Sequence, residues 1–458
     1  MHTILHQIDR IKTLRRTVLD RHRETPLLSR SLADARRVVI INSASRSGSS
    51  LLYALLGKLP QVLSLTGEAA PFYKLNSRID GFNPHASDRI PTELLGDVID
   101  FAGLSLDFLA DLYRAETESI TARIDADRYI DDLLLRLALQ WTDLELDETT
   151  LRGTIETAFT EYAAGHPLFD TEEFYLCLLE HLCRLSPRIN PFYYDIGTDK
   201  VALRFPFIDI PSGPPTESFT LEEPPFILLP PKHRPTVEDL GDKVILLKST
   251  VDCYRMNLVE RLFPGAEIRI IHLVRNPAAT INGLYDGWHH RGFFSHNLAV
   301  RVGGEAAPTP LRIKGYSDRY PFGGTWWNFD LPPGWEQFAD RDLLDVCAFQ
   351  WHSANAEILA NLAETRHSAC RVHFEEIIRS PESRRREFER MLDFMGITSS
   401  EIDSLRLHAM PVVQSTLPPQ LYRWKKREEM ISRVLAIPRI REMAAAFGYD
   451  DASREGWL

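Results

Sequence analysis

Four short apolar runs constrain the fold of this chain more than any other feature. They are rich in β-branched residues, and each ends in a polar turn followed by a helical pattern; they span residues 37–45, 242–250, 266–277 and 369–377. Such runs are typical of strands buried on both faces. Strands that alternate with helices indicate a mostly parallel sheet with helices on both sides. We therefore expect an α/β fold.

The pattern changes between about residues 76 and 205, where amphipathic helical segments follow one another without intervening strands. We expect a helical insertion at 76–205 in an α/β core formed by 38–75 and 206–458, preceded by a helical segment at 1–37. A second irregular block, residues 291–335, is rich in glycine, proline and aromatic residues. Long irregular segments inside compact domains are usually binding loops or lids.

The first 24 residues carry apolar side chains at helical spacing, with a basic opposite face. This helix is expected to pack on its own domain or on a partner subunit, giving a homo-oligomer, with docking on a membrane surface as the alternative. No apolar run approaches the roughly 18 residues that span a bilayer. Five scattered cysteines indicate a reducing compartment, so the expected location is cytoplasmic. The formal net charge of -11 argues against a nucleic-acid partner.

Residues 41–56, INSASRSGSSLLYALL, have the pattern of a strand, a small-residue turn and a helix start. Compared with the nucleotide-hydrolase loop GxxxxGK[ST], Gly48 and Ser50 match, but Ser49 replaces the lysine. Backbone N–H groups and the helix N-terminus still favour an anion. Arg46 places a permanent cation on the other side of the turn. A turn that binds nothing is the alternative.

A second anion site is predicted at Arg275, which ends an apolar run and precedes a helix opened by Pro277. A cation at the carboxyl end of a strand, beside a helix N-terminus, is suited to holding a phosphate. The alternative is an arginine that merely forms a salt bridge at the strand end.

These motifs, in their order and spacing, resemble the sulfotransferase family that uses 3′-phosphoadenosine 5′-phosphosulfate (PAPS). The resemblance rests on SASRSGSSLL, TGEAAPF, LLKST, FPGAEIRIIHLVRNP and RVHFEEII. It covers residues 38–75, 244–290, 345–396 and, more loosely, 410–450, and it leaves out the helical insertion. It implies a P-loop-like fold and sulfuryl transfer from PAPS to an acceptor hydroxyl. The RSGSS loop is closer to the tyrosylprotein, carbohydrate and bacterial branches than to the cytosolic one.

The resemblance implies two groups of cofactor-binding residues. Arg275 would grip the 3′-phosphate. Gly283 stands where the family has a serine, so this position would contribute only its backbone amide, with Thr280 or Asn282 as candidate substitutes for the serine. The loop residues would cradle the 5′-phosphosulfate: Arg46, Ser47, Gly48, Ser49, Ser50 and Leu51.

A C-terminal segment, QLYRWKKRE, is similar to the family's loop that closes over the adenine and 3′-phosphate. Its candidates are Arg423, Trp424 and Lys425; the alternative is a solvated basic helix start with one buried tryptophan. Phe374 stands where relatives carry a tyrosine near the adenine, or belongs to the core.

The expected chemistry needs a base for the acceptor and cations for the leaving phosphate. Arg46 and Lys248 suit the second task, although a solvated strand-end lysine is the alternative for Lys248. Cytosolic relatives have a histidine where Thr250 stands, so Glu68 is the expected base, as in the tyrosylprotein branch. The alternative for Glu68 is a glutamate that caps the following turn.

His289 and His290 are the rival bases. Together with His296 they lack a cysteine or carboxylate at a recognisable ligand spacing, so no metal is expected.

Two other function classes stay open. A nucleotide kinase or hydrolase requires the lysine that is absent after Gly48, whereas a non-catalytic nucleotide-binding relative is compatible with Thr250 and Gly283. The acceptor is expected to be a small molecule or a carbohydrate, covered by the helical insertion at 76–205 and the aromatic loop near Trp326–Trp335. Three tryptophans would suit sugar stacking or would simply pin a long loop: Trp326, Trp327 and Trp335.

Overall fold

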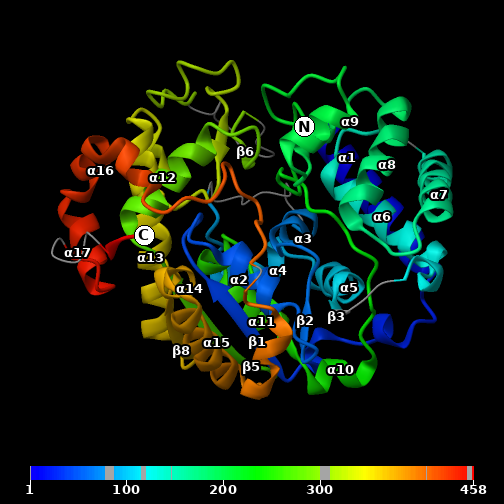
Figure 1. Ribbon diagram of the computed structural model, residues 1–458, viewed down its shortest axis with the longest axis horizontal. Helices are drawn as coiled ribbons and strands as arrows, with labels where there is room; N and C mark the ends of the chain where they lie inside the picture. Colours follow the sequence, from blue (N-terminus) through cyan, green and yellow to red (C-terminus); the bar gives the residue numbers. More distant parts are fainter. Residues whose placement is uncertain are drawn as a thin grey trace.

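The computed structural model of the chain describes residues 2–77, 87–114, 120–145, 147–299, 310–408, 410–450 and 456–458. A six-stranded sheet lies at its centre, with the order β3-β2-β4-β1-β5-β8 (Figure 1). All neighbouring pairs are parallel except β2 and β3. The strands are β1 (Arg37–Asn42), β2 (Val62–Ser64), β3 (Tyr113–Arg114), β4 (Val244–Leu247), β5 (Glu267–Val274) and β8 (Ser368–His373). The predicted mostly parallel α/β fold is confirmed.

The pleat of β1 explains how this sheet is buried on both faces. Val38 and Ile40 belong to one hydrophobic cluster, and Val39 and Ile41 to another. Successive side chains of a strand point to opposite faces, so an unbroken apolar run supplies both.

Helices cover the two faces and the ends of the sheet. Those of the amino-terminal half are α1 (His2–Asp20), α2 (Ser49–Leu56), α3 (Ala70–Leu75), α4 (Leu95–Val98), α5 (Phe101–Asp111), α6 (Ala126–Gln140), α7 (Glu148–Gly165), α8 (Thr171–Leu185) and α9 (Thr198–Arg204). Those of the carboxyl-terminal half are α10 (Val237–Asp242), α11 (Met256–Leu262), α12 (Pro277–Trp288), α13 (Leu343–Glu364), α14 (Phe374–Arg379), α15 (Pro381–Met395), α16 (Glu428–Leu435) and α17 (Pro438–Ala446).

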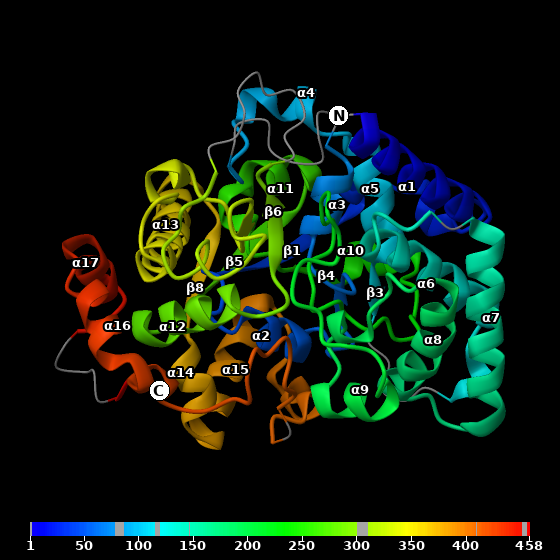
Figure 2. The same cartoon turned by 90° about the horizontal axis from the view of Figure 1, so that it is seen from above.

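The predicted helical insertion is not uniform. Helices α6–α9 gather at the opposite side of the molecule from α16 and α17 and bury their own hydrophobic cluster (Figure 2). Helices α4 and α5 instead contribute to the cluster that covers the sheet. The segment also contains β3, which pairs antiparallel with β2, so the expectation of an insertion without strands is wrong. The boundaries at 76 and 205 stay a prediction.

Helix α1 uses its apolar face inside its own chain. Ile8 and Ile11 join the cluster that covers the sheet, whereas Val18 and Leu19 join the cluster of α6–α9. Arg15 forms a buried ion pair with Asp107 at 2.6 Å. The face on which the oligomer and membrane expectations depended is therefore covered within the protein. In the described part of the chain, no helix combines the length and apolar character that crossing a membrane would require.

The aromatic block between α12 and α13 forms a small hairpin of β6 (Phe294–Asn297) and β7 (Trp326–Asn328). Trp326, Trp327 and Trp335 are buried, and the indole of Trp327 donates to the carbonyl of Asp330 at 2.9 Å. These tryptophans pin the hairpin, so the expectation of sugar stacking on them is wrong. Residues 300–309 of the block lie outside the described residues.

Candidate functional site

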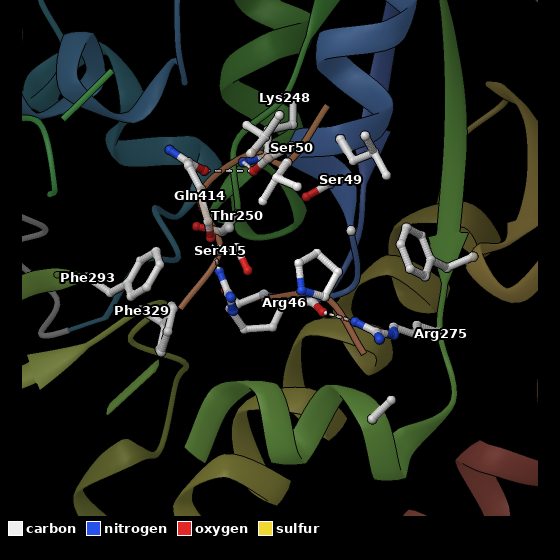
Figure 3. Close-up of a pocket in the computed structure, with 18 of the residues that line it drawn as sticks. Arg46, Ser49, Ser50, Lys248, Thr250, Arg275, Phe293, Phe329, Gln414 and Ser415 are labelled. Atoms are coloured by element: carbon white, nitrogen blue, oxygen red, sulfur yellow. Dashed lines mark hydrogen bonds between the residues drawn. The ribbon is translucent and has the colours of Figure 1, made fainter. Parts of the chain in front are cut away.

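A cavity of about 590 Å³ lies at the carboxyl ends of the central strands (Figure 3). From β1 the chain moves to β2 on one side of the sheet, and it later reaches β5 on the other side of β1. Open α/β sheets bind ligands where the strand order reverses in this way. The residues that follow β1, β2, β4 and β5 all line the cavity, which therefore coincides with the predicted site.

The loop after β1 is shaped to hold an anion against backbone N–H groups. Gly48 precedes α2 with a φ of 96°, and a Cβ there would collide with the ring of Phe374. Arg46 also has a positive φ, of 68°, which is uncommon for a residue other than glycine. No side chain caps the amino end of α2, so its first N–H groups stay available for a ligand.

Two half-buried guanidinium groups, those of Arg46 and Arg275, lie at the cavity. The Nε atoms of Arg46 and Arg275 have no hydrogen-bond partner, and neither side chain forms an ion pair within the part of the chain that the structure describes. Burial, then the neighbouring charges of Arg275 and Arg423, lower the pKa of Arg46 to about 10. Burial also lowers the pKa of Arg275. Desolvated, mutually repelling cations of this kind favour a bound anion.

Each of these cations stacks on a phenylalanine. The Arg46 guanidinium lies 4.8 Å from the Phe293 ring centre, and that of Arg275 lies 4.8 Å from the Phe374 ring centre. Arg275 also donates to the carbonyl of Arg46 at 3.2 Å. The two predicted anion sites therefore adjoin one another, and Phe374 lines the cavity between the loop and Arg275.

Gln414 contacts the loop at the positions expected to hold the anion. Its carbonyl oxygen accepts a hydrogen bond from Arg46 at 3.0 Å, and its side-chain oxygen accepts one from Ser50 at 2.8 Å. Its own N–H donates to Asp195 at 3.0 Å. The segment around residue 414 thus crosses the cavity and satisfies part of the cradle with its own oxygens.

Lys248 and Glu68 form a close ion pair on the other side of Ser50. The Lys248 ammonium group donates to Glu68 and, at 3.0 Å, to the hydroxyl of Ser50. The lysine side chain is buried, so it is not the solvated strand-end residue of the alternative interpretation. Thr250 lines the same part of the cavity, and its N–H lies 3.5 Å from Glu68. The pair places a carboxylate and an ammonium group beside the anion loop.

The rival histidines lie away from this pair. Neither His289 nor His290 lines the cavity. The imidazole Nδ1 of His289 lies 3.0 Å from the hydroxyl of Tyr320, and that of His290 accepts from the N–H of Gly292 at 3.2 Å. Burial lowers the pKa of each to about 4. The geometry favours Glu68 over the histidine pair as the base.

The residues expected around the 3′-phosphate are only partly brought together. Gly283 does not line the cavity, and a Cβ there would lie 3.2 Å from that of Arg46, so this glycine makes room for the arginine. Of the two suggested substitutes, Asn282 lines the cavity, whereas the hydroxyl of Thr280 donates to its own helix.

The C-terminal candidates divide in the same way. Arg423 and Trp424 line the cavity, but Lys425 does not and lies over the ring of Tyr422. Arg423 is paired with Asp286 at 3.1 Å, so its charge is already balanced in part. Ser47 is buried beneath the loop and does not line the cavity.

Sequence reasoning missed two buried carboxyl groups beneath the site. Asp330 accepts hydrogen bonds from Ser45 at 3.1 Å and Tyr254 at 3.0 Å, and burial with the charge of Asp88 raises its pKa to about 7. Burial and the charge of Glu68 raise the pKa of Asp252 to about 7. Neither aspartate stands in a motif, and Gln414 has no sequence signal either.

One group of side chains in the described residues has the composition of a metal site. Ligand atoms of Glu161, Cys177 and His181 lie within 4.8 Å of one another on α7 and α8. The group is remote in sequence from every residue that lines the cavity.

No protein-family model matches this chain, and neither does any curated protein. Solved structures resemble it weakly. The sulfotransferase domain from the curacin biosynthetic pathway has a TM-score of 0.35 at 11% identity, covering 91% of this chain and 98% of that one. The sulfotransferase domain of the Synechococcus PCC 7002 olefin synthase has a TM-score of 0.34 at 13% identity, covering 91% and 96%. A Mycobacterium avium sulfotransferase has a TM-score of 0.32 at 12% identity, covering 92% and 79%. Similarity at this level carries no argument about activity.

Proposed function

We propose that the protein is a sulfotransferase that moves a sulfuryl group from PAPS to an acceptor hydroxyl. The products are a sulfate ester and adenosine 3′,5′-bisphosphate. The observation that carries the proposal is the pair of half-buried guanidiniums of Arg46 and Arg275, which form no ion pair with the described residues and flank an uncapped helix N-terminus. PAPS carries two separate anionic groups, and this cavity offers two adjoining cationic positions for them.

The residues around the loop have distinct proposed roles. The loop from Arg46 to Leu51 holds the 5′-phosphosulfate, and Arg275 holds the 3′-phosphate. Phe374 and Trp424 both line the cavity and are the aromatic side chains proposed to contact the adenine. No metal ligand set lines the cavity in the described residues, and none is required by this arrangement.

The reaction needs a proton acceptor and charge neutralisation, and the ion pair beside Ser50 can supply both. Glu68 takes the proton of the acceptor hydroxyl as the new bond from oxygen to sulfur forms. Lys248 and Arg46 stabilise the negative charge left on the phosphate oxygen as its bond to sulfur breaks. The contact of Lys248 with both Ser50 and Glu68 supports this division.

The kinase or hydrolase alternative is less well supported, because Ser49 stands where the lysine for a triphosphate would be. A non-catalytic nucleotide-binding protein would use the same two cations without the Glu68–Lys248 chemistry. Binding and turnover measurements separate these alternatives.

Calorimetry with adenosine 3′,5′-bisphosphate tests the binding site. Arg275→Ala removes charge-assisted contacts of about 1.5–3 kcal/mol, so affinity is expected to fall about 10- to 150-fold. Arg291→Ala is the matched control, because Arg291 bonds to Phe192 and Thr198 and does not line the cavity. Unchanged affinity in Arg275→Ala, or tighter binding of ATP with magnesium than of the bisphosphate, contradicts the proposal.

A further inference from the structure

The wall of the cavity opposite Arg275 is apolar. Phe293 and Phe329 lie on the other side of Arg46 from Arg275 (Figure 3). The lining there continues with aliphatic side chains, which are Pro71, Leu221, Pro224 and Ile227. Glu68 and Thr250 line the same cavity. An acceptor whose hydroxyl reaches Glu68 therefore lies in the cavity that this apolar wall bounds.

Phe293 and Phe329 are held in an unusual backbone conformation. Their φ angles are 64° and 63°, in the left-handed region that bulky side chains rarely adopt. The two rings stack with their centres 4.9 Å apart and their planes 26° from parallel. A Cβ at Gly287 would collide with the Phe329 ring, so that glycine makes room for it. Strain of this kind persists where the surroundings enforce it, and it concentrates at functional sites.

The charges that line the cavity do not suit an anionic acceptor. Its cationic side chains are Arg46, Lys248, Arg275 and Arg423, and each already has a proposed role or an acidic partner. Glu222 and Glu223 also line the cavity, where Arg136 at 2.8 Å and Lys74 at 3.6 Å balance their charges, so these two positions offer no free cation to an acidic sugar or a sulfated polymer.

Two of the exposed side chains that line the cavity are apolar. Val412 is 65% exposed and Leu421 is 49% exposed, and both line the cavity. Exposed apolar side chains at a cavity entrance favour the entry of an apolar molecule over that of a heavily hydrated one.

We infer that the acceptor is a small apolar alcohol or phenol, whose body lies against the Phe293–Phe329 pair while its hydroxyl reaches Glu68. This inference rests on the proposed sulfotransferase activity. It makes Phe293 and Phe329 the residues that determine acceptor specificity. The surface that would have suited a carbohydrate, the tryptophans of the hairpin, is buried away from the cavity.

The test uses 2-naphthol as a phenolic probe, with glucose and chondroitin as the carbohydrate probes. Binding of 2-naphthol is followed by its fluorescence, on the free protein and on the protein saturated with adenosine 3′,5′-bisphosphate. We expect saturable 2-naphthol binding and PAPS-dependent sulfation of 2-naphthol, without sulfation of the two carbohydrates. Phe329→Ala and the milder Phe293→Leu should each weaken 2-naphthol binding about tenfold. The bisphosphate affinity of Phe329→Ala should stay within about twofold, which also reports correct folding. Phe293→Leu also removes the ring that stacks on Arg46, so it is compared by its 2-naphthol binding alone.

Phe322→Leu is the matched control, because Phe322 stacks on Tyr320 in the same hairpin region but does not line the cavity. Failure of the wild-type protein to bind the bisphosphate would count against the proposed activity. Bisphosphate binding without 2-naphthol binding, or sulfation of glucose or chondroitin in preference to 2-naphthol, overturns the acceptor inference alone. Phenylalanine variants that retain the affinity for 2-naphthol overturn the assignment of these residues.

Discussion

At the scale of single residues, the position of Lys248 carries the most chemical information. Its ammonium group contacts both the loop hydroxyl of Ser50 and the carboxylate of Glu68. One buried cation thereby connects the anion loop to the candidate base.

Glu68→Gln tests the base assignment. Glutamine keeps the shape and a hydrogen-bond acceptor but lacks basicity, so PAPS-dependent turnover should fall about 100- to 10,000-fold. Bisphosphate affinity, measured by calorimetry, should stay near normal, because Glu68 is not placed against the nucleotide.

His290→Gln serves as the control for Glu68→Gln, since His290 lies outside the cavity lining. If Glu68→Gln keeps more than about a tenth of the activity while the histidine variant is inactive, the base is the histidine.

At the scale of elements, the segment that precedes α16 behaves as a cover for the loop. Residues 410–415 and 419–424 line the cavity, and Gln414 hydrogen-bonds to Arg46 and Ser50. Gln414 has a positive φ of 45°, so its backbone is held in a sparsely populated conformation. The contact of Gln414 with Asp195 anchors the same segment to the region between α8 and α9.

Gln414→Ala should therefore raise the affinity for adenosine 3′,5′-bisphosphate. The change removes the side-chain acceptor that occupies the Ser50 hydroxyl, a neutral hydrogen bond of about 0.5–1.5 kcal/mol, so we expect about a 2- to 13-fold gain by calorimetry. Gln337→Ala, which changes an exposed glutamine that does not line the cavity, should leave the affinity unaltered. A loss of affinity in Gln414→Ala would mean that Gln414 binds the nucleotide rather than competing with it.

At the scale of the whole molecule, the site is supported by buried carboxyl groups whose ionisation affects folding. Asp330 connects the hairpin to Ser45 under the loop and to Tyr254 after β4. Burial and the charge of Asp88 raise the pKa of Asp330 from its ordinary value of 3.8 to about 7. Because this pKa is raised in the folded state, Asp330 contributes its full stabilising effect to folding below about pH 4, and that contribution is lost as the pH rises through 7.

Asp330→Asn removes this dependence, because an amide of the same shape stays neutral. Compared with the wild type, the variant should gain stability progressively between pH 4 and 7, by up to about 1.4 kcal/mol per pH unit. Chemical denaturation at pH 5, 6, 7 and 8 measures the difference. Asp340→Asn is the control, since Asp340 is exposed on the same segment. A constant difference at all four pH values would show that Asp330 stays ionised in the folded protein.

The sequence by itself determined the parts of this protein that depend on near neighbours. Uninterrupted apolar runs predicted β1, β4 and β5, because a strand buried on both faces needs apolar residues at successive positions. The fourth run also forms a strand, β8, but β8 is at the edge of the sheet and exposes several of its residues. Small residues between a strand and a helix predicted the loop, and Gly48 has the positive φ that such a turn requires. The family resemblance assigned Arg46, Lys248 and Arg275 to one site, and they line one cavity because the parallel strands that they follow end at the same edge of the sheet.

Only the tertiary structure decided which side chains from distant segments meet at that edge. The hairpin tryptophans became core, while Phe293 and Phe329, from the two sides of the same hairpin, became cavity wall. The aromatic residues of this block predict that it is hydrophobic, but in an irregular segment they do not predict in which direction each side chain points. Gln414 reaches Ser50 across 364 residues of chain, and Glu68 reaches Lys248 across 180. Such contacts follow from how the whole chain packs, and no local spacing encodes them.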